Sequence, residues 1–232
     1  MGKKFYRDYA LVTVLLLGLM LGFVLLINHY FITSDTFDDS DMRMIVIDAG
    51  HGGEDGGAVS ITGISESVYN LQIATCLNDL FNLIGVKTYM LRTTDCDLHI
   101  EGTTIAQRKA SDLKQRVNTV NQFRNAILIS IHQNYFEDYR YSGLQTFYRN
   151  DASKALAEQI QASYKSFISP TSRRLSQKKT GVYLLENASC KAVLVECGFL
   201  SNREEEARLK TLHYQQKLAS VIVHAVMTEL AS

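Results

Sequence analysis

Residues 44–53 read Met44-Ile45-Val46-Ile47-Asp48-Ala49-Gly50-His51-Gly52-Gly53. The first part is a continuous apolar run, which is typical of a strand that is buried on both faces. A loop follows in which glycines flank His51, and glycine lets the backbone turn sharply and bring an imidazole up to a ligand. A buried strand that ends in such a loop indicates a site at the edge of a sheet.

Strands and helices alternate along the chain after this stretch. Apolar runs predict strands over residues 44–48, 86–91, 126–131, 143–148, 181–185 and 192–195. Helical spacing of apolar residues predicts helices over residues 68–83, 105–123, 152–167 and 215–230. This alternation predicts an α/β fold, a three-layer sandwich in which a mostly parallel or mixed central sheet is flanked by helices.

Polar side chains stand at or just beyond the ends of three predicted strands: His51, His132 and Glu196. Burying such a group without a partner is costly, and a metal ion would supply a partner. Glu66 begins the helix after the first strand, and His51, Glu66 and His132 together make the N₂O ligand set of a hydrolytic zinc site with one position open for water. Glu196 would remain as a free carboxylate in reach of that water. Spacing alone leaves the simpler roles open, namely a hydrogen-bonded histidine and a helix cap.

The N-terminal segment has a different composition. Residues 10–27 form an uncharged apolar run of 18 residues, and residues 30–32 extend it, which is long enough to span a bilayer as a helix. Lysines and an arginine precede the run and four aspartates follow it, so the positive-inside rule predicts a cytoplasmic N-terminus over residues 1–9, a transmembrane signal-anchor over 10–32 and a linker over 33–43. We therefore expect the domain over residues 44–232 to lie outside the cytoplasm. A cleaved signal peptide is the alternative, although residues 26–40 contain no small-x-small cleavage site.

Charge and cysteine content narrow the classes of partner. Lysine plus arginine and aspartate plus glutamate number 24 each, so no long-range field favours nucleic acid, and we expect no nucleic-acid partner. The 4 cysteines have the spacing neither of a disulfide scaffold nor of a zinc knuckle. We interpret them as free and mostly buried thiols.

Five ordered blocks carry a family resemblance. The first block is Ile47 to Ala58 with His51 and Asp55, and the second is Glu66 with Asn70-Leu71 together with the strand end Leu91-Arg92-Thr93 that follows. The third is Arg108 to Asn121 with Arg116, and the fourth is Ser130 to Asn134 with His132. The fifth is Leu194-Val195-Glu196-Cys197-Gly198-Phe199-Leu200-Ser201-Asn202. From about residue 44 to 230 the chain resembles the zinc-dependent N-acetylmuramoyl-L-alanine amidases called amidase type 3. The chain departs from the family at Ala49, where proline is common, at Ser67, where a lysine often follows the glutamate, and at Gln133 and Tyr135, which flank Asn134.

The resemblance implies a function and a site. It implies an amidase catalytic domain over residues 44–232 that hydrolyses the amide bond between N-acetylmuramic acid and L-alanine in peptidoglycan. His51, Glu66 and His132 would bind one Zn²⁺ per chain, and Glu196 would be the catalytic carboxylate. With a single anchor and a bare catalytic domain, the chain most resembles the germination-specific amidases of spore-forming bacteria, which act in the spore cortex to prepare muramic-δ-lactam. The expected location is then the cell envelope or the forespore intermembrane space, with an accessory protein as a further expected partner.

Three more residues are candidates for binding substrate: Arg92, Arg116 and Asn134. Arginine forks suit the carboxylates of acidic stem peptides, whereas structural salt bridges for the arginines and a loop hydrogen bond for Asn134 remain open. The basic stretch Arg173-Arg174 with Lys178-Lys179 is interpreted as a solvated loop, with a glycan or partner contact as the alternative.

Two other functions compete with the zinc amidase. A cysteine hydrolase would use Cys197 with His132 as its base, but it leaves His51 and Glu66 unexplained. A non-catalytic, membrane-tethered wall-binding protein would keep the fold without the reaction, although none of the predicted ligands is missing.

Overall fold

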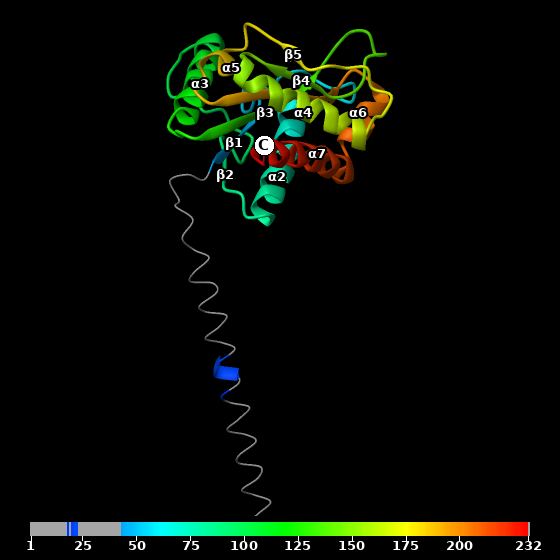
Figure 1. Cartoon of the computed structure of the whole chain (residues 1–232). Coiled ribbons are helices and arrows are strands. Elements are labelled where there is room, and N and C mark those ends of the chain that lie inside the picture. The colour runs from blue at the N-terminus through cyan, green and yellow to red at the C-terminus, as the bar shows by residue number, and fades with distance from the viewer. Residues whose placement is uncertain (1–17, 19, 23–42, 232) are drawn as a thin grey trace, which may run out of the picture. The chain divides into compact units, whose positions relative to one another are not determined.

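The computed structural model describes residues 18, 20–22 and 43–231 (Figure 1). Residues 18 and 20–22 are helical. The predicted cytoplasmic segment 1–9, almost all of the predicted membrane span 10–32 and the predicted linker up to residue 42 lie outside the described residues. Among the helices that are described, none combines the length and the apolar character needed to cross a membrane. From Arg43 onward the chain forms a compact unit of its own.

Within residues 43–231, six strands form one mixed sheet in the order β2-β1-β3-β6-β4-β5. The strands are β1 (Met44–Ala49), β2 (Thr88–Met90), β3 (Ala126–Asn134), β4 (Gln145–Tyr148), β5 (Gln177–Lys178) and β6 (Lys191–Phe199). Strands β1, β2, β3 and β6 are parallel, whereas β4 runs antiparallel to β6 and pairs in parallel with β5. The carboxyl ends of β1, β3 and β6 therefore meet at one edge, together with the start of β4.

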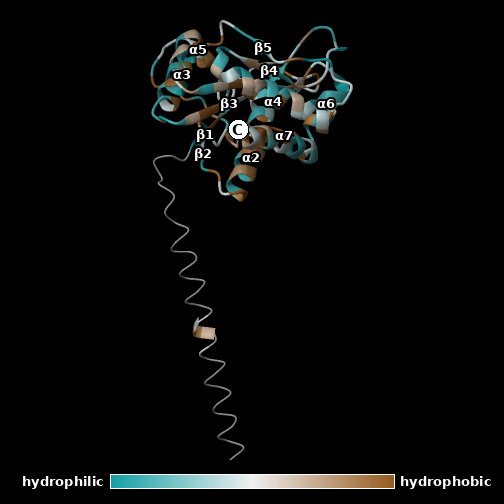
Figure 2. Ribbon diagram, in the orientation of Figure 1, coloured by the Kyte–Doolittle hydropathy of each residue, from teal (hydrophilic) through white to brown (hydrophobic). Residues whose placement is uncertain are grey.

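Helices cover both faces of this sheet. Helices α2 (Glu66–Leu83), α4 (Asp151–Phe167) and α7 (Leu212–Leu230) share one core with Ile45, Ile129 and Val195. Helices α3 (Ile105–Val120) and α5 (Tyr183–Asn187) share another with Val46 and Leu128 on the opposite face. Figure 1 shows α2 and α7 side by side, and Figure 2 shows hydrophobic residues along α2 and the central strands. The predicted α/β fold with a mixed sheet flanked by helices is confirmed.

One predicted strand is a helix in the structure. The apolar run at residues 181–185 predicts a strand, but the chain forms helix α5 there and buries Leu184 and Leu185 against the face that carries α3. A short apolar run fits a strand and a buried helical turn equally well, so its pattern could not separate them. Helix α6 (Arg203–Leu209) and strand β5 were not predicted. Both are short, and β5 consists of two exposed residues without any apolar alternation.

A buried ion pair connects β1 to α3. Arg116 Nη1 lies 2.5 Å from Asp48 Oδ1, and Arg116 Nε lies 2.7 Å from Asp112 Oδ2. Ser130 Oγ donates a hydrogen bond of 2.6 Å to the other oxygen of Asp48. Burial raises the pKa of Asp48, but the positive charges of Arg116 and His132 outweigh that effect and leave the pKa lowered. Asp48 is therefore a paired carboxylate in the core, directly ahead of the His51 loop.

This pair yields a prediction about stability. Asp48→Asn leaves Arg116 buried with only part of its countercharge, so the free energy of unfolding should fall by about 3 kcal/mol. Glu158→Gln is the control, because Glu158 forms a surface pair with Lys154 in which both side chains are at least half exposed; it should change stability by less than about 1 kcal/mol. Denaturant unfolding followed by circular dichroism measures both. Equal stability of the two variants would contradict a stabilising role for the Asp48–Arg116 pair.

Candidate metal centre

The loop after β1 positions His51. Gly50 N donates to Ile131 O at 3.0 Å, which keeps the loop beside the end of β3. His51 has a φ of 61°, the only positive φ of a non-glycine residue in the part of the chain that the structure describes. Such a conformation is uncommon for residues other than glycine, although histidine adopts it more often than most, and strained backbone positions cluster at functional sites. Asp55 Oδ2 lies 2.9 Å from His51 Nδ1, and with the proton on Nδ1 the other ring nitrogen, Nε2, is free to bind a ligand.

Helix α2 positions Glu66, its first residue. The Glu66 side chain is 5% exposed, and three donors hold its carboxylate. Gln133 N donates to Oε1 at 3.0 Å, Asn70 Nδ2 donates to the same oxygen at 3.2 Å, and Ala58 N donates to Oε2 at 3.1 Å. The carboxylate is thereby fixed in orientation before any ligand arrives.

The two predicted histidines meet at this carboxylate. His51 Nε2 lies 3.3 Å from Glu66 Oε2, and His132 Nδ1 lies 3.0 Å from Glu66 Oε1. Each of the three residues offers one donor atom, and these three atoms lie within 4.8 Å of one another. The structure thus brings together the three residues that the sequence predicts as ligands.

The surroundings of the three side chains fit a metal. Two nitrogens and one carboxylate oxygen are the donors that zinc accepts at hydrolytic sites. Two glycines leave the room that the donors need: a Cβ at Gly50 would lie 2.2 Å from His132 Nε2, and a Cβ at Gly57 would lie 2.7 Å from Glu66 Oε2. Larger residues at either position would therefore push the donor side chains apart.

Mutual hydrogen bonds shift the pKa values of the site. Burial lowers the pKa of His51, but hydrogen bonds and charge from Glu66 and Asp55 outweigh it and raise the pKa above its usual value. Burial raises the pKa of Glu66, but the two histidines outweigh it and lower the pKa. Glu66 is therefore ionised and offers a negatively charged oxygen to a ligand.

Glu196 lies beside these residues without joining them. It pairs in register with His132 on the neighbouring strand, and strands in a sheet lie about 4.8 Å apart. Glu196 is 9% exposed, and its Oε2 has no hydrogen-bond partner among the described residues. Burial raises the pKa of Glu196, and the charge of His132 only partly offsets this. A buried carboxylate with a raised pKa and an uncommitted oxygen has the properties of a general base.

The predicted substrate-binding arginines lie behind the site. Arg92 is 3% exposed and donates to the carbonyl oxygens of Ala49 at 2.8 Å, Gly50 at 3.0 Å and Ser67 at 2.9 Å. Arg116 is 2% exposed and, besides its aspartate partners, donates to His51 O at 2.9 Å. Both guanidinium groups thus support the His51 loop, and none of these contacts favours the prediction that they bind substrate. Asn134 ends β3 and is half-buried, and a substrate contact there stays a prediction.

Sequence reasoning did not assign the supporting roles of Asp55 and Asn70. Asp55 orients His51, and Asn70 Nδ2 bridges Glu66 and Gly50 O at 3.0 Å. The spacing of Glu66 and Asn70 on one helix, four residues apart, was a signal that the two side chains meet.

Cys197 does not fit the role of a nucleophile. Its side chain is fully buried in the core on the side of α2 and α7, and burial strongly raises the pKa of its thiol. A thiolate is the reactive form of cysteine, so this environment suppresses reactivity. All 4 cysteines are free, as the sequence predicts, and Cys76 and Cys197 are the buried ones.

Comparison with known proteins identifies the family. The family model described as N-acetylmuramoyl-L-alanine amidase matches residues 45–228. The germination-specific N-acetylmuramoyl-L-alanine amidase of Bacillus subtilis is 34% identical over 221 residues, which cover 91% of this chain and 92% of that protein. The amidase LytC of the same organism is 30% identical over 182 residues, which cover 77% of this chain and 34% of that protein.

A solved structure agrees with the sequence relatives. The CwlD amidase from Clostridioides difficile, determined in complex with the GerS lipoprotein, superimposes with a TM-score of 0.79 at 35% sequence identity, covering 82% of this chain and 98% of that one. The chain therefore belongs to the N-acetylmuramoyl-L-alanine amidase family and is an enzyme that acts on peptidoglycan as an amidase of this kind.

Proposed function

We propose that the chain is a zinc-dependent amidase in which His51, Glu66 and His132 hold one Zn²⁺ and Glu196 is the catalytic base. The observation that carries this proposal is the convergence of three donor atoms within 4.8 Å of one another, with Glu196 in register beside one of them. The amidase activity follows from the family, whereas the metal and the residue roles are inferred from this arrangement.

The chain's own residues divide the work of amide hydrolysis. Zinc supplies Lewis acidity, which polarises a carbonyl group and lowers the pKa of water. Glu196 takes the proton of the attacking water as the new C–O bond forms at the lactyl carbonyl of N-acetylmuramic acid. As the C–N bond breaks, Glu196 returns this proton to the departing amino group of L-alanine. Asp55, through His51 Nδ1, keeps the imidazole in the tautomer that leaves Nε2 as a donor to the metal.

The ligand assignment predicts the metal content of variants. Because a metal with three protein ligands needs all of them to be held well, His51→Ala, Glu66→Ala or His132→Ala should each remove most of the zinc from the purified chain. His99→Ala is the control, since His99 also pairs with a carboxylate, Asp97, at 2.6 Å, but is not one of the three donor residues. Elemental analysis by mass spectrometry measures zinc per chain. Full zinc occupancy in His51→Ala would contradict the assignment of His51 as a ligand.

The role of Glu196 predicts a variant that loses activity but keeps its zinc. Glu196→Gln keeps the shape of the side chain and removes the base, so peptidoglycan hydrolysis should fall by about 10² to 10⁴ while zinc content and unfolding temperature stay unchanged. Activity is measured as new L-alanine amino groups and as stem peptides freed from glycan, by mass spectrometry of the digest. Glu101→Gln, an exposed carboxylate, is the control with normal activity expected.

The outcomes of this experiment separate the competing functions. Loss of zinc together with activity would make Glu196 a ligand, and retained activity would remove it from the mechanism. New reducing sugar ends without freed L-alanine would indicate a glycosidase. Binding of peptidoglycan by the zinc-loaded wild type without any release would favour the non-catalytic wall-binding protein.

We further propose a role in the spore cortex, with an accessory protein and a membrane anchor. The cortex role is supported by the germination-specific relative, which matches nearly the full length of this chain, and the accessory protein by the CwlD complex with a lipoprotein. The anchor over residues 10–32 is supported by the apolar run and by the charges that flank it. The domain would then face the forespore intermembrane space or the cell envelope.

The anchor and the location predict one pattern of protease protection. In membranes from sporulating cells, protease added on the extracytoplasmic side should digest residues 43–232, whereas the end that carries Lys3 and Arg7 should remain protected. Antibodies against the two ends measure this on blots. A mature chain that begins near residue 33, found by N-terminal sequencing, would contradict the anchor.

A further inference from the structure

A basic cavity lies next to the carboxyl end of β6. It has a volume of about 460 Å³, and four of the described arginines line it: Arg140, Arg173, Arg174 and Arg208. The acidic side chain in its lining is Glu205, which is 1% exposed and already accepts hydrogen bonds from Gly143 N and Phe199 N. Four positive charges against one negative charge make the lining electropositive.

Two of the arginines are committed to acidic partners. Arg140 forms a fork with Asp138, with Nη2 at 2.7 Å from Oδ2, and Arg208 Nη2 lies 3.2 Å from Glu205 Oε1. Arg173 is exposed, and its side chain has no partner among the described residues. Arg174 has no acidic partner within ion-pair distance in the same part of the chain. The uncompensated positive charge of the cavity therefore comes from Arg173 and Arg174.

Arg174 is held in place but keeps donors free. Its Nε donates to Ser142 O at 2.6 Å, its Nη1 donates to Gln145 Oε1 at 2.5 Å, and its guanidinium carbon lies 4.4 Å from the centroid of the Phe199 ring. A guanidinium group has five N–H donors, so three remain for a ligand. A fixed, planar cation with free donors is suited to a carboxylate.

Strand pairing connects this cavity to the proposed catalytic base. Gln145, which accepts from Arg174, is directly opposite Glu196 in the β4–β6 pair, and opposite residues on one face have Cβ atoms about 5 Å apart. Phe199, beneath Arg174, is three residues beyond Glu196, or about 10 Å along an extended strand. The cavity is thus on the order of 10 Å from Glu196, beside which the amide bond would be cut.

This separation matches the substrate of the proposed reaction. An extended peptide spans roughly 3.5 Å per residue, so a carboxylate on the second or third residue of a stem peptide lies about 7 to 10 Å from the amide bond that is cut. We propose that the arginine cavity binds a carboxylate of the stem peptide, and that Arg173 and Arg174 make the enzyme prefer stems with free carboxylates over amidated stems. This proposal rests on the proposed function, because it takes the bond cut beside Glu196 as its origin.

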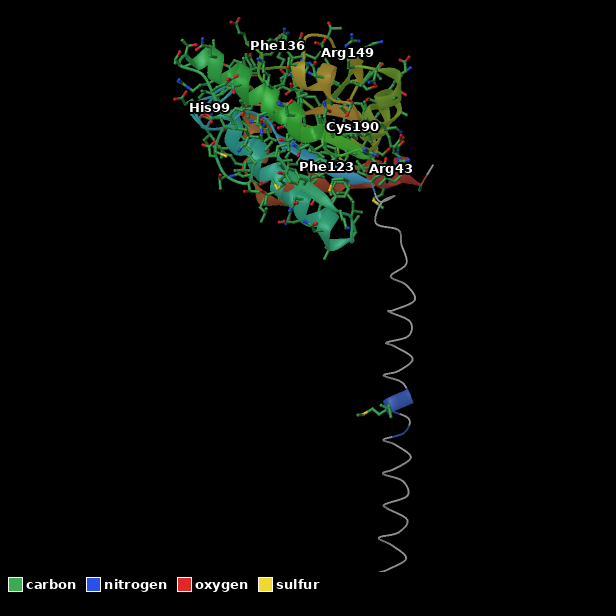
Figure 3. The ribbon with its side chains drawn as sticks, turned by 90° about the vertical axis from the view of Figure 1, so that its left-hand side faces the viewer. Arg43, His99, Phe123, Phe136, Arg149 and Cys190 are labelled. Carbon is green, nitrogen blue, oxygen red and sulfur yellow. The ribbon has the colours of Figure 1, made fainter. Side chains whose placement is uncertain are left out.

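The test compares two soluble glycan-peptide fragments that differ only in whether the stem carboxylates are free or amidated. The zinc-loaded full chain is assayed as wild type, Arg173→Gln and Arg124→Gln. Arg124 is an exposed arginine that precedes β3, at the end of the strands opposite to Glu196. Figure 3 shows its neighbour Phe123 on the side of the domain away from Phe136, whose ring lies 5.1 Å from that of Tyr141 in the lining of the cavity. Arg173→Gln changes an exposed side chain without described contacts, so the fold should be retained.

Arg173→Gln should raise KM for the free-acid fragment by about 3- to 10-fold, because a partly exposed charge-assisted hydrogen bond is lost. Its kcat should stay within about twofold, and its KM for the amidated fragment should match that of the wild type, as should both constants of Arg124→Gln. An unchanged KM for the free acid, or an equal rise for both fragments, would overturn the carboxylate site while leaving the proposed function intact. Failure of the wild type to release either stem peptide would overturn both.

Discussion

The guanidinium group of Arg116 is a charge buried in the core, and the surrounding structure is arranged to compensate it. Such a charge is tolerated only where partners surround it. Asp48 and Asp112 supply the countercharge, and the carbonyl oxygens of Ala49 and His51 accept its remaining donors. The end of β1, the helix α3 and the His51 loop are therefore bound to one another through a single side chain. Arg92, two residues beyond β2, also supports this loop by donating to the carbonyl oxygens of Ala49 and Gly50.

Much of the site followed from the sequence because its key residues stand at strand ends. His51, His132 and Glu196 come at or shortly after the ends of apolar runs, and the carboxyl ends of parallel strands meet at one edge whatever the details of packing. The prediction for Glu66 rested on its position at the start of a predicted helix. Each of these predictions is local, because it needs only the type of one helix or strand and its place in the chain order.

The roles that the sequence left open, and the one element that it predicted wrongly, depend on contacts between distant segments. Arg92 and Arg116 carry the right chemistry for a stem peptide, but their burial is decided by how β2 and α3 pack against the His51 loop. The apolar run at residues 181–185 became helix α5 because the second core had room for Leu184 and Leu185 on a helical turn. The antiparallel direction of β4, which brings Gln145 and through it Arg174 to the proposed base, has no signature in any short stretch of sequence.

The proposed ligands come from two layers of the domain, since both histidines belong to the sheet side and Glu66 belongs to helix α2. Their separation is therefore set by how closely α2 lies against the sheet, through buried side chains such as Ile73 and Leu77 further along the same helix. A core substitution that moved this helix by a fraction of an ångström would change both distances to Glu66 together. The distances between the proposed donor atoms thus depend on the spacing between helix α2 and the sheet, which the packing of the core sets.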